Sequence, residues 1–113
     1  MVLLYEPDPD LVPQWQYLLE SLGHTVEVAA TLAAVWERAS EQSAALAVVR
    51  PAPDVDGWAL CQEIQTCIGV PVIGLLPSGV AGEPTADLHV LPLPVAPEAL
   101  RAVVQRVATC VPV

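Results

Sequence analysis

The chain has 113 residues, enough for one folded domain whose core needs neither disulfides nor a metal. Apolar residues make up 54% of it, which excludes a disordered chain. The formal net charge is −9, without a single lysine, and this acidic excess repels nucleic-acid phosphates and anionic lipid. We therefore expect a single domain over residues 1–113 that binds neither nucleic acid nor membrane directly and uses no lysine amine.

The start of the chain predicts a soluble cytoplasmic protein. No basic residue precedes the first apolar run, and the sequence turns acidic at Glu6, unlike a signal peptide. The longest apolar stretch, residues 67–76, contains Gly and Pro and is too short to span a bilayer. The three cysteines, an odd number without zinc-ligand spacing, are expected to be small buried hydrophobic residues: Cys61, Cys67 and Cys110.

Five short apolar segments predict strands, and they lie at residues 1–5, 26–30, 44–49, 70–76 and 88–91. The segment 44–49 is apolar without alternation, as in a strand that is buried on both faces. Its carboxyl end holds Val49, Arg50 and Pro51, and so offers no catalytic side chain. This is unusual, because sites in open α/β sheets are built at the carboxyl ends of such strands.

Helical patterns separate the strands. Asp8 or Asp10 is expected to cap the first helix, with Pro9 or Pro13 in its first turn and an apolar stripe that includes a buried Trp15. Later helices are expected to begin after the caps Thr31 and Asp56 and at Pro97, and Gly23 and Gly69 are expected to end the first and third. This alternation predicts a doubly wound, flavodoxin-like parallel sheet of five strands in the order 2-1-3-4-5.

Four local motifs then resemble those of the receiver domains of bacterial two-component response regulators, which share the CheY-like fold. They are YEPDPD at 5–10, PDVDG at 53–57, VPVI at 70–73, and the Leu93-Pro94 and Pro97-Glu98 pairs before the last helix. None of the four motifs is specific by itself, but their shared order and spacing are specific. The resemblance covers the whole chain. In this family two acids after the first strand hold Mg²⁺, and an aspartate ending the third strand accepts a phosphoryl group. A hydroxyl and a lysine then contact that group, because its developing anion needs nearby cations.

Carried over residue by residue, the resemblance implies a degenerate pocket. Glu6 matches the first acid, but Pro7 stands at the second, with Asp8 one residue further on. Three apolar residues take the remaining places: Val49 at the phosphoacceptor, Leu76 at the hydroxyl and Leu93 at the lysine, while Val90 stands at the switch aromatic. A slip by one residue brings Arg50 to the acceptor position, which is no better, and no slip supplies a lysine. We expect an apolar, closed rim with no catalytic residue, metal or cofactor.

The segment between Leu76 and Leu93 is shorter than in the family, and its breaker-rich sequence implies that the fourth helix is shortened or absent. In active receivers that region contributes to the output and dimerisation face, so a remodelled partner surface is expected. Its candidate residues are Trp36, Val80, Val90, Arg101 and Gln105. The favoured hypothesis is a phosphorylation-independent, non-enzymatic signalling module, a pseudo-receiver, that binds a protein partner or itself as a homodimer.

Two alternatives stay open. The first is a flavodoxin-like domain for a small ligand such as a nucleotide or cobalamin, but the segment from Glu6 to Pro9 is poor in N–H donors for phosphate, and neither His24 nor His89 has a cobalamin-site context. The second is residual phosphoryl chemistry at Asp54 or Asp56, or a weak metal pair of Glu6 and Asp8. It is disfavoured because no cation is expected there to balance the phosphoryl charge.

Overall fold

The computed structural model describes residues 1–41, 44–51, 56–77, 88–93 and 95–109. The described elements alternate between strand and helix along most of the chain. In order they are β1 (Val2–Tyr5), α1 (Val12–Ser21), β2 (Val26–Ala29), α2 (Leu32–Glu41), β3 (Leu46–Val49), α3 (Gly57–Ile68), β4 (Val72–Pro77), β5 (Leu88–Leu93) and α4 (Pro97–Thr109). All five strands were predicted, although β5 continues two residues past the predicted end at Leu91.

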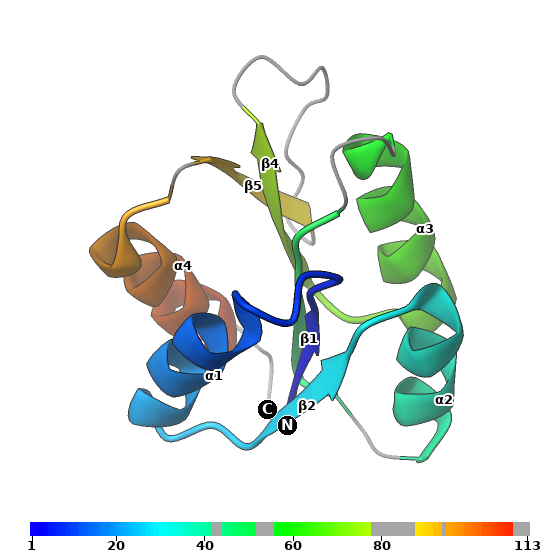
Figure 1. The fold of residues 1–113 in the computed structure, drawn as a ribbon, viewed down its shortest axis with the longest axis horizontal. Coiled ribbons are helices and arrows are strands. Elements are labelled where there is room, and N and C mark those ends of the chain that lie inside the picture. The colour runs from blue at the N-terminus through cyan, green and yellow to red at the C-terminus, as the bar shows by residue number, and fades with distance from the viewer. Residues whose placement is uncertain (42–43, 52–55, 78–87, 94, 110–113) are drawn as a thin grey trace.

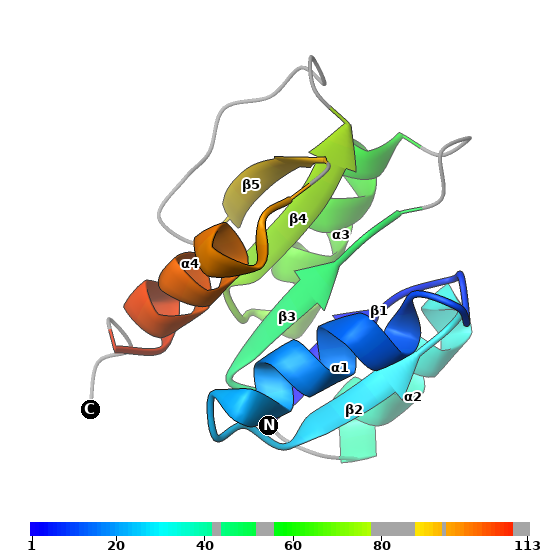
Figure 2. The ribbon, with the colours of Figure 1, turned by 60° about the vertical axis from the view of Figure 1, so that its left-hand side comes forward.

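The strands form one parallel sheet in the order β2-β1-β3-β4-β5, as predicted for a flavodoxin-like, CheY-like fold. Helices α1 and α4 cover one face of this sheet, and α2 and α3 cover the other (Figure 1). Figure 2 shows α1 and α4 lying over the same face, and residues of the two helices are in contact. Because the strands are parallel, their carboxyl ends all lie along one edge of the sheet.

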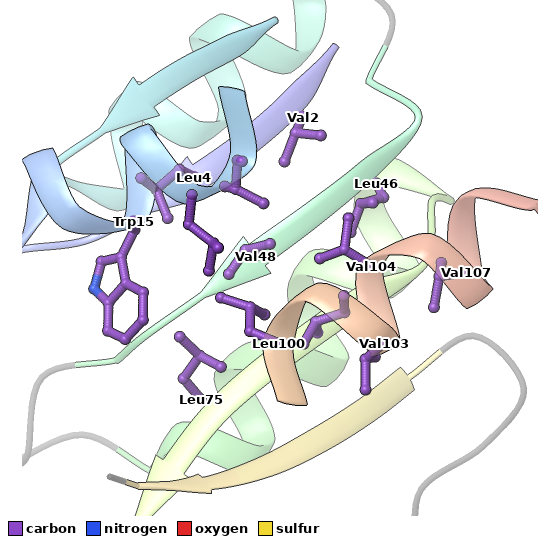
Figure 3. Packing of buried hydrophobic residues seen from close by; sticks show 13 residues of the cluster. Val2, Leu4, Trp15, Leu46, Val48, Leu75, Leu100, Val103, Val104 and Val107 are labelled. Atoms are coloured by element: carbon purple, nitrogen blue, oxygen red, sulfur yellow. The ribbon is translucent and has the colours of Figure 1, made fainter. Parts of the chain in front are cut away.

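Each face of the sheet has its own hydrophobic core, because successive side chains of a strand point to opposite faces. In β1, Leu4 packs into the core under α1 and α4, whereas Leu3 packs into the core under α2 and α3. Figure 3 shows the first core, in which Leu100 and Val104 of α4 face the sheet and Trp15 lies at one end. Trp15, which was predicted to be buried, is 6% exposed.

Local capping chemistry fixes most helix ends as predicted. The Thr31 hydroxyl accepts a hydrogen bond from Ala34 N at 3.1 Å, and the Asp56 carboxylate accepts one from Ala59 N at 3.2 Å. Helix α3 ends at Gly69, whose φ of 76° lies in the left-handed region that glycine adopts without steric cost.

The predicted cap of α1 is wrong. Its N-cap residue is Leu11, which makes no side-chain cap hydrogen bond. Asp8 Oδ1 instead accepts a hydrogen bond from Asp10 N at 2.9 Å, so this carboxylate shapes the turn before the helix. Pro13 does lie in the first turn of α1, where its missing N–H is dispensable.

The cysteine prediction is correct for Cys61 but wrong for Cys67. Both lie on α3, yet Cys61 is buried against the sheet and Cys67 is exposed, because six positions along a helix do not return to the same face.

Some predictions concern residues outside the described ranges. They are those for Cys110, Val80 and Asp54, and the predicted shortening of the fourth helix, which concerns residues 78–87. No helix in the described part of the chain is long and apolar enough to cross a membrane.

Candidate functional site

The candidate site is the carboxyl edge of the sheet, where β1, β3 and β4 end side by side. The register places Tyr5 of β1 opposite Val49 of β3, and Val49 opposite Gly74 of β4. The residues that follow these strand positions, Glu6 and Arg50, therefore emerge next to each other. The backbone holds them there, since Arg50 N donates to Tyr5 O at 3.0 Å and Glu6 N donates to Ala29 O at 3.1 Å.

Glu6 is completely buried, and three donors share its carboxylate. The Trp15 indole Nε1 donates to Oε1 at 2.8 Å. Arg50 Nε donates to the same oxygen, which makes an ion pair. The backbone N of Asp8 donates to Oε2 at 3.1 Å. The Glu6 side chain thus joins the end of β1 to the start of α1 and to the end of β3.

The other half of this pair, Arg50, is partly buried, with its side chain 13% exposed. The hydrogen bond to Glu6 raises the pKa of the Arg50 guanidinium above its usual value, while burial opposes that shift and the charges of Glu6 and Asp8 add to it. The guanidinium therefore stays charged, and the buried carboxylate has a permanent cation beside it.

This pair corrects the expectation of a wholly apolar rim without a cation. From the sequence, Arg50 is expected only as a poor replacement for the phosphoacceptor and Trp15 only as a core residue, whereas both donate to Glu6 in the structure. The sequence did hold a signal for the pair: an acid directly after one predicted strand and an arginine directly after its predicted neighbour. Adjacent parallel strands bring such residues together, and a charge at a buried strand end requires a partner.

Two strand ends at the rim carry buried apolar side chains. Val49 and Leu76, at the positions compared with the phosphoacceptor and the hydroxyl, are each 1% exposed. Leu76 Cδ2 lies 2.6 Å from where a Cβ on Gly57 would be, and Pro51 Cγ lies 3.1 Å from the same point. Leu76 therefore packs into the space between the start of α3 and the residue that follows Arg50. Of Leu93 the structure describes the backbone, which pairs with Pro77.

The residues at this rim do not fit a magnesium ion of the kind that the resemblance implies. Both Glu6 oxygens already accept hydrogen bonds, and neither Pro7 nor Val49 has a side-chain oxygen to offer. Asp8 uses one carboxylate oxygen in its own turn. Within the described ranges, no three His, Cys, Asp or Glu side chains are grouped so that they could hold a metal ion.

The candidate partner residues that the structure describes do not all lie on one surface. Arg101 and Gln105 are both exposed on α4, one turn apart, and Val90 is half-buried on β5. Trp36 is half-buried on α2, which covers the opposite face of the sheet (Figure 1). The structure thus separates Trp36 from the pair on α4.

Three solved structures with the same fold are close to this chain in size. A response regulator receiver domain protein from Bacillus halodurans is 25% identical, with a TM-score of 0.76 and coverage of 94% of each chain. The receiver domain of a signal transduction histidine kinase from Syntrophus aciditrophicus is 22% identical, with a TM-score of 0.78 over 97% of this chain and 90% of that one. The chemotaxis protein CheY4 of Vibrio cholerae is 19% identical, with a TM-score of 0.72 over 94% and 96%.

The sequence matches no protein-family model and no curated protein. The assignment therefore depends on the three-dimensional likeness, which covers nearly the whole chain and agrees with the strand order β2-β1-β3-β4-β5. The chain therefore has the fold of the receiver domains of response regulators.

Proposed function

We propose that this protein is a pseudo-receiver: a non-enzymatic, phosphorylation-independent signalling module that acts by binding a protein partner or a second copy of itself. Receiver domains of the same fold occur in a response regulator and in a histidine kinase, which supports a role in two-component signalling. The proposal goes further, because it assigns the rim a structural role in place of phosphoryl transfer.

The packing of Val49 and Leu76 is the observation that carries the proposal. Phosphoryl transfer to a receiver needs a carboxylate nucleophile at the end of β3 and space for the transferred group beside it. Here the β3 end presents a buried valine, and Leu76 packs against Gly57 and Pro51. Placing a phosphoryl group there would require a rearranged core and an anion among apolar side chains, which is costly without a paired cation.

The charge at the rim supports the same proposal. A receiver that accepts a phosphoryl group uses cations to balance the developing negative charge. The chain has no lysine, and the rim guanidinium of Arg50 is already paired with the buried Glu6. If the Arg50 guanidinium paired with an incoming phosphoryl group instead, the buried Glu6 carboxylate would lose its partner.

The direct test is intact-mass spectrometry after incubation with acetyl phosphate and MgCl₂. A phosphorylatable receiver domain, treated in parallel, serves as the positive control. We expect no phosphoryl adduct on this protein under conditions that modify the control. A stoichiometric adduct would disprove the proposal, and peptide mapping would then show whether Asp54 or Asp56 carries it.

The second part of the proposal concerns how the module acts. Size-exclusion chromatography with light scattering measures self-association, and it should give the same molar mass with and without acetyl phosphate and MgCl₂. A molar mass that changes on addition of acetyl phosphate, beyond the change caused by MgCl₂ alone, would contradict a phosphorylation-independent module. A shift in melting temperature with a nucleotide or cobalamin would instead favour the small-ligand alternative.

A further inference from the structure

Arg50 occupies a distinctive place in the rim, because it connects elements that are distant in sequence. Its guanidinium donates to Glu6, 44 residues earlier, and Glu6 in turn accepts from Trp15 on α1. The arginine follows β3 directly, and its backbone N also bonds to the end of β1. One cationic side chain thus joins the ends of two central strands to the helix that packs on them.

The charge balance explains why a cation is needed here. Glu6 is fully buried, and a buried carboxylate without a partner is strongly unfavourable. A rim with several acids would need a divalent ion to neutralise them. This rim has Pro7 and Val49 where the resemblance implies two further acids, so one buried carboxylate remains, and one guanidinium balances it.

We propose that the Arg50 guanidinium permanently takes the place of the divalent cation at this rim, and that the geometry of the rim is therefore independent of metal ions. The inference rests on the proposed function, since it explains how a receiver fold keeps its rim ordered without metal-dependent phosphoryl transfer. Arginine suits this role better than lysine, because its planar guanidinium is always charged, is more weakly hydrated and donates in a fixed geometry. Arg50 is a positioning residue here.

The test compares the response of stability to MgCl₂ in four proteins: the wild type, Arg50→Met, the double variant Glu6→Gln/Arg50→Met, and Arg101→Met as a matched control on the exposed face of α4. Stability is measured as the urea midpoint, followed by tryptophan fluorescence. Each MgCl₂ titration is matched by NaCl of equal ionic strength, which removes general screening. The urea midpoint measures stability, so the test does not depend on any activity of the protein.

We expect the midpoint of the wild type and of Arg101→Met to respond equally to MgCl₂ and to NaCl. Arg50→Met should have a clearly lower midpoint than Arg101→Met, because the buried Glu6 then lacks its cation, and MgCl₂ and NaCl should change it alike, because Pro7 and Val49 offer no oxygen to a magnesium ion. The double variant should recover most of the loss, because no buried charge remains.

Three results would overturn the inference. They are a specific magnesium response in the wild type, an Arg50→Met midpoint equal to that of Arg101→Met, and a double variant that recovers none of the loss. If Arg50→Met does not fold, Arg50→Lys takes its place: it should fold with a reduced midpoint and show no specific magnesium response, and a specific response would overturn the inference. The phosphoryl-adduct measurement is separate, so failure of the proposed function is distinguishable from failure of the role of Arg50.

Discussion

Leu76 packs so closely against Gly57 that a side chain of any size at Gly57 would meet it. A Cβ at that position would lie 2.6 Å from Leu76 Cδ2 and 3.1 Å from Pro51 Cγ. The contact joins β4 to the start of α3 at the rim, and both residues are buried. Glycine is thus required at the first residue of α3 for space, because Leu76 fills the volume that a larger side chain would take.

The first prediction is that Gly57→Ala destabilises the protein by about 1–3 kcal/mol, the usual cost of overpacking. The gain in helix propensity from glycine to alanine is smaller, at most about 1 kcal/mol, and it does not offset the clash. In a Leu76→Ala background the same change should cost less, because the opposing methyl group is gone. Urea denaturation of the wild type, the two single variants and the double variant measures this coupling. If the two losses of stability simply add, the contact with Leu76 is not the cause of the loss in Gly57→Ala.

A second close contact lies below the rim, between β4 and α3. A Cβ on Gly74 would lie 2.8 Å from Cys61 Sγ. We predict that Gly74→Ala lowers the free energy of unfolding by about 1–3 kcal/mol, since neither the strand nor the buried thiol can move away easily. Cys61→Ala should relieve most of this cost, and an undiminished loss in the double variant would show that the strain comes from elsewhere.

The buried thiol also predicts a loss of stability at alkaline pH. Burial raises the pKa of Cys61 to about 12. In the unfolded chain a thiol loses its proton near about pH 8.5, whereas the folded protein keeps it protonated up to about pH 12. The unfolded state therefore binds fewer protons in this window, and stability falls as the pH rises, by up to about 1.4 kcal/mol per unit.

Urea denaturation of the wild type and of Cys61→Ala at a series of pH values between about 8 and about 10 isolates this contribution. The other titrating groups are common to both proteins, so the difference in slope belongs to Cys61. The wild type should lose stability faster with rising pH. Parallel pH profiles would show that the thiol titrates alike in the folded and unfolded states.

The fold was predictable because it depends on local patterns. Apolar runs of strand length alternate with helical stripes, and cap residues such as Thr31 and Asp56 act through a hydrogen bond to a backbone N–H three residues away. The role of Asp8 is harder to predict from the sequence. An aspartate before a helix can either cap the helix or accept a hydrogen bond within its own turn, and the two arrangements have nearly the same sequence pattern.

The candidate site was predictable only in part. The apolar character of Val49 and Leu76 follows from their identity, and the structure buries both. The pairing of Arg50 with Glu6 depends on the register between β1 and β3, a relationship between segments that no single position reveals. By its own strand end, Arg50 resembles a poor replacement for the phosphoacceptor, whereas its role is set by Glu6 on the neighbouring strand.

The last prediction concerns the third member of this cluster, Trp15. Trp15→Phe keeps an aromatic ring in the core but removes the indole N–H that donates to Glu6 Oε1 at 2.8 Å. Hydrogen bonds to a charged group contribute about 1.5–3 kcal/mol, so the free energy of unfolding should fall by at least that amount, with a further loss from the smaller ring. Trp36→Phe, half-buried on α2, is the control for the loss of ring size, and it should cost less.

A double-mutant cycle separates the hydrogen bond from packing. In Glu6→Gln the acceptor is neutral, so the additional cost of Trp15→Phe should be smaller there than in the wild type. If the cost is the same in both backgrounds, Trp15 contributes through packing alone. The carboxylate would then depend on Arg50 and the Asp8 backbone for its stabilisation, and the cluster would have two effective donors in place of three.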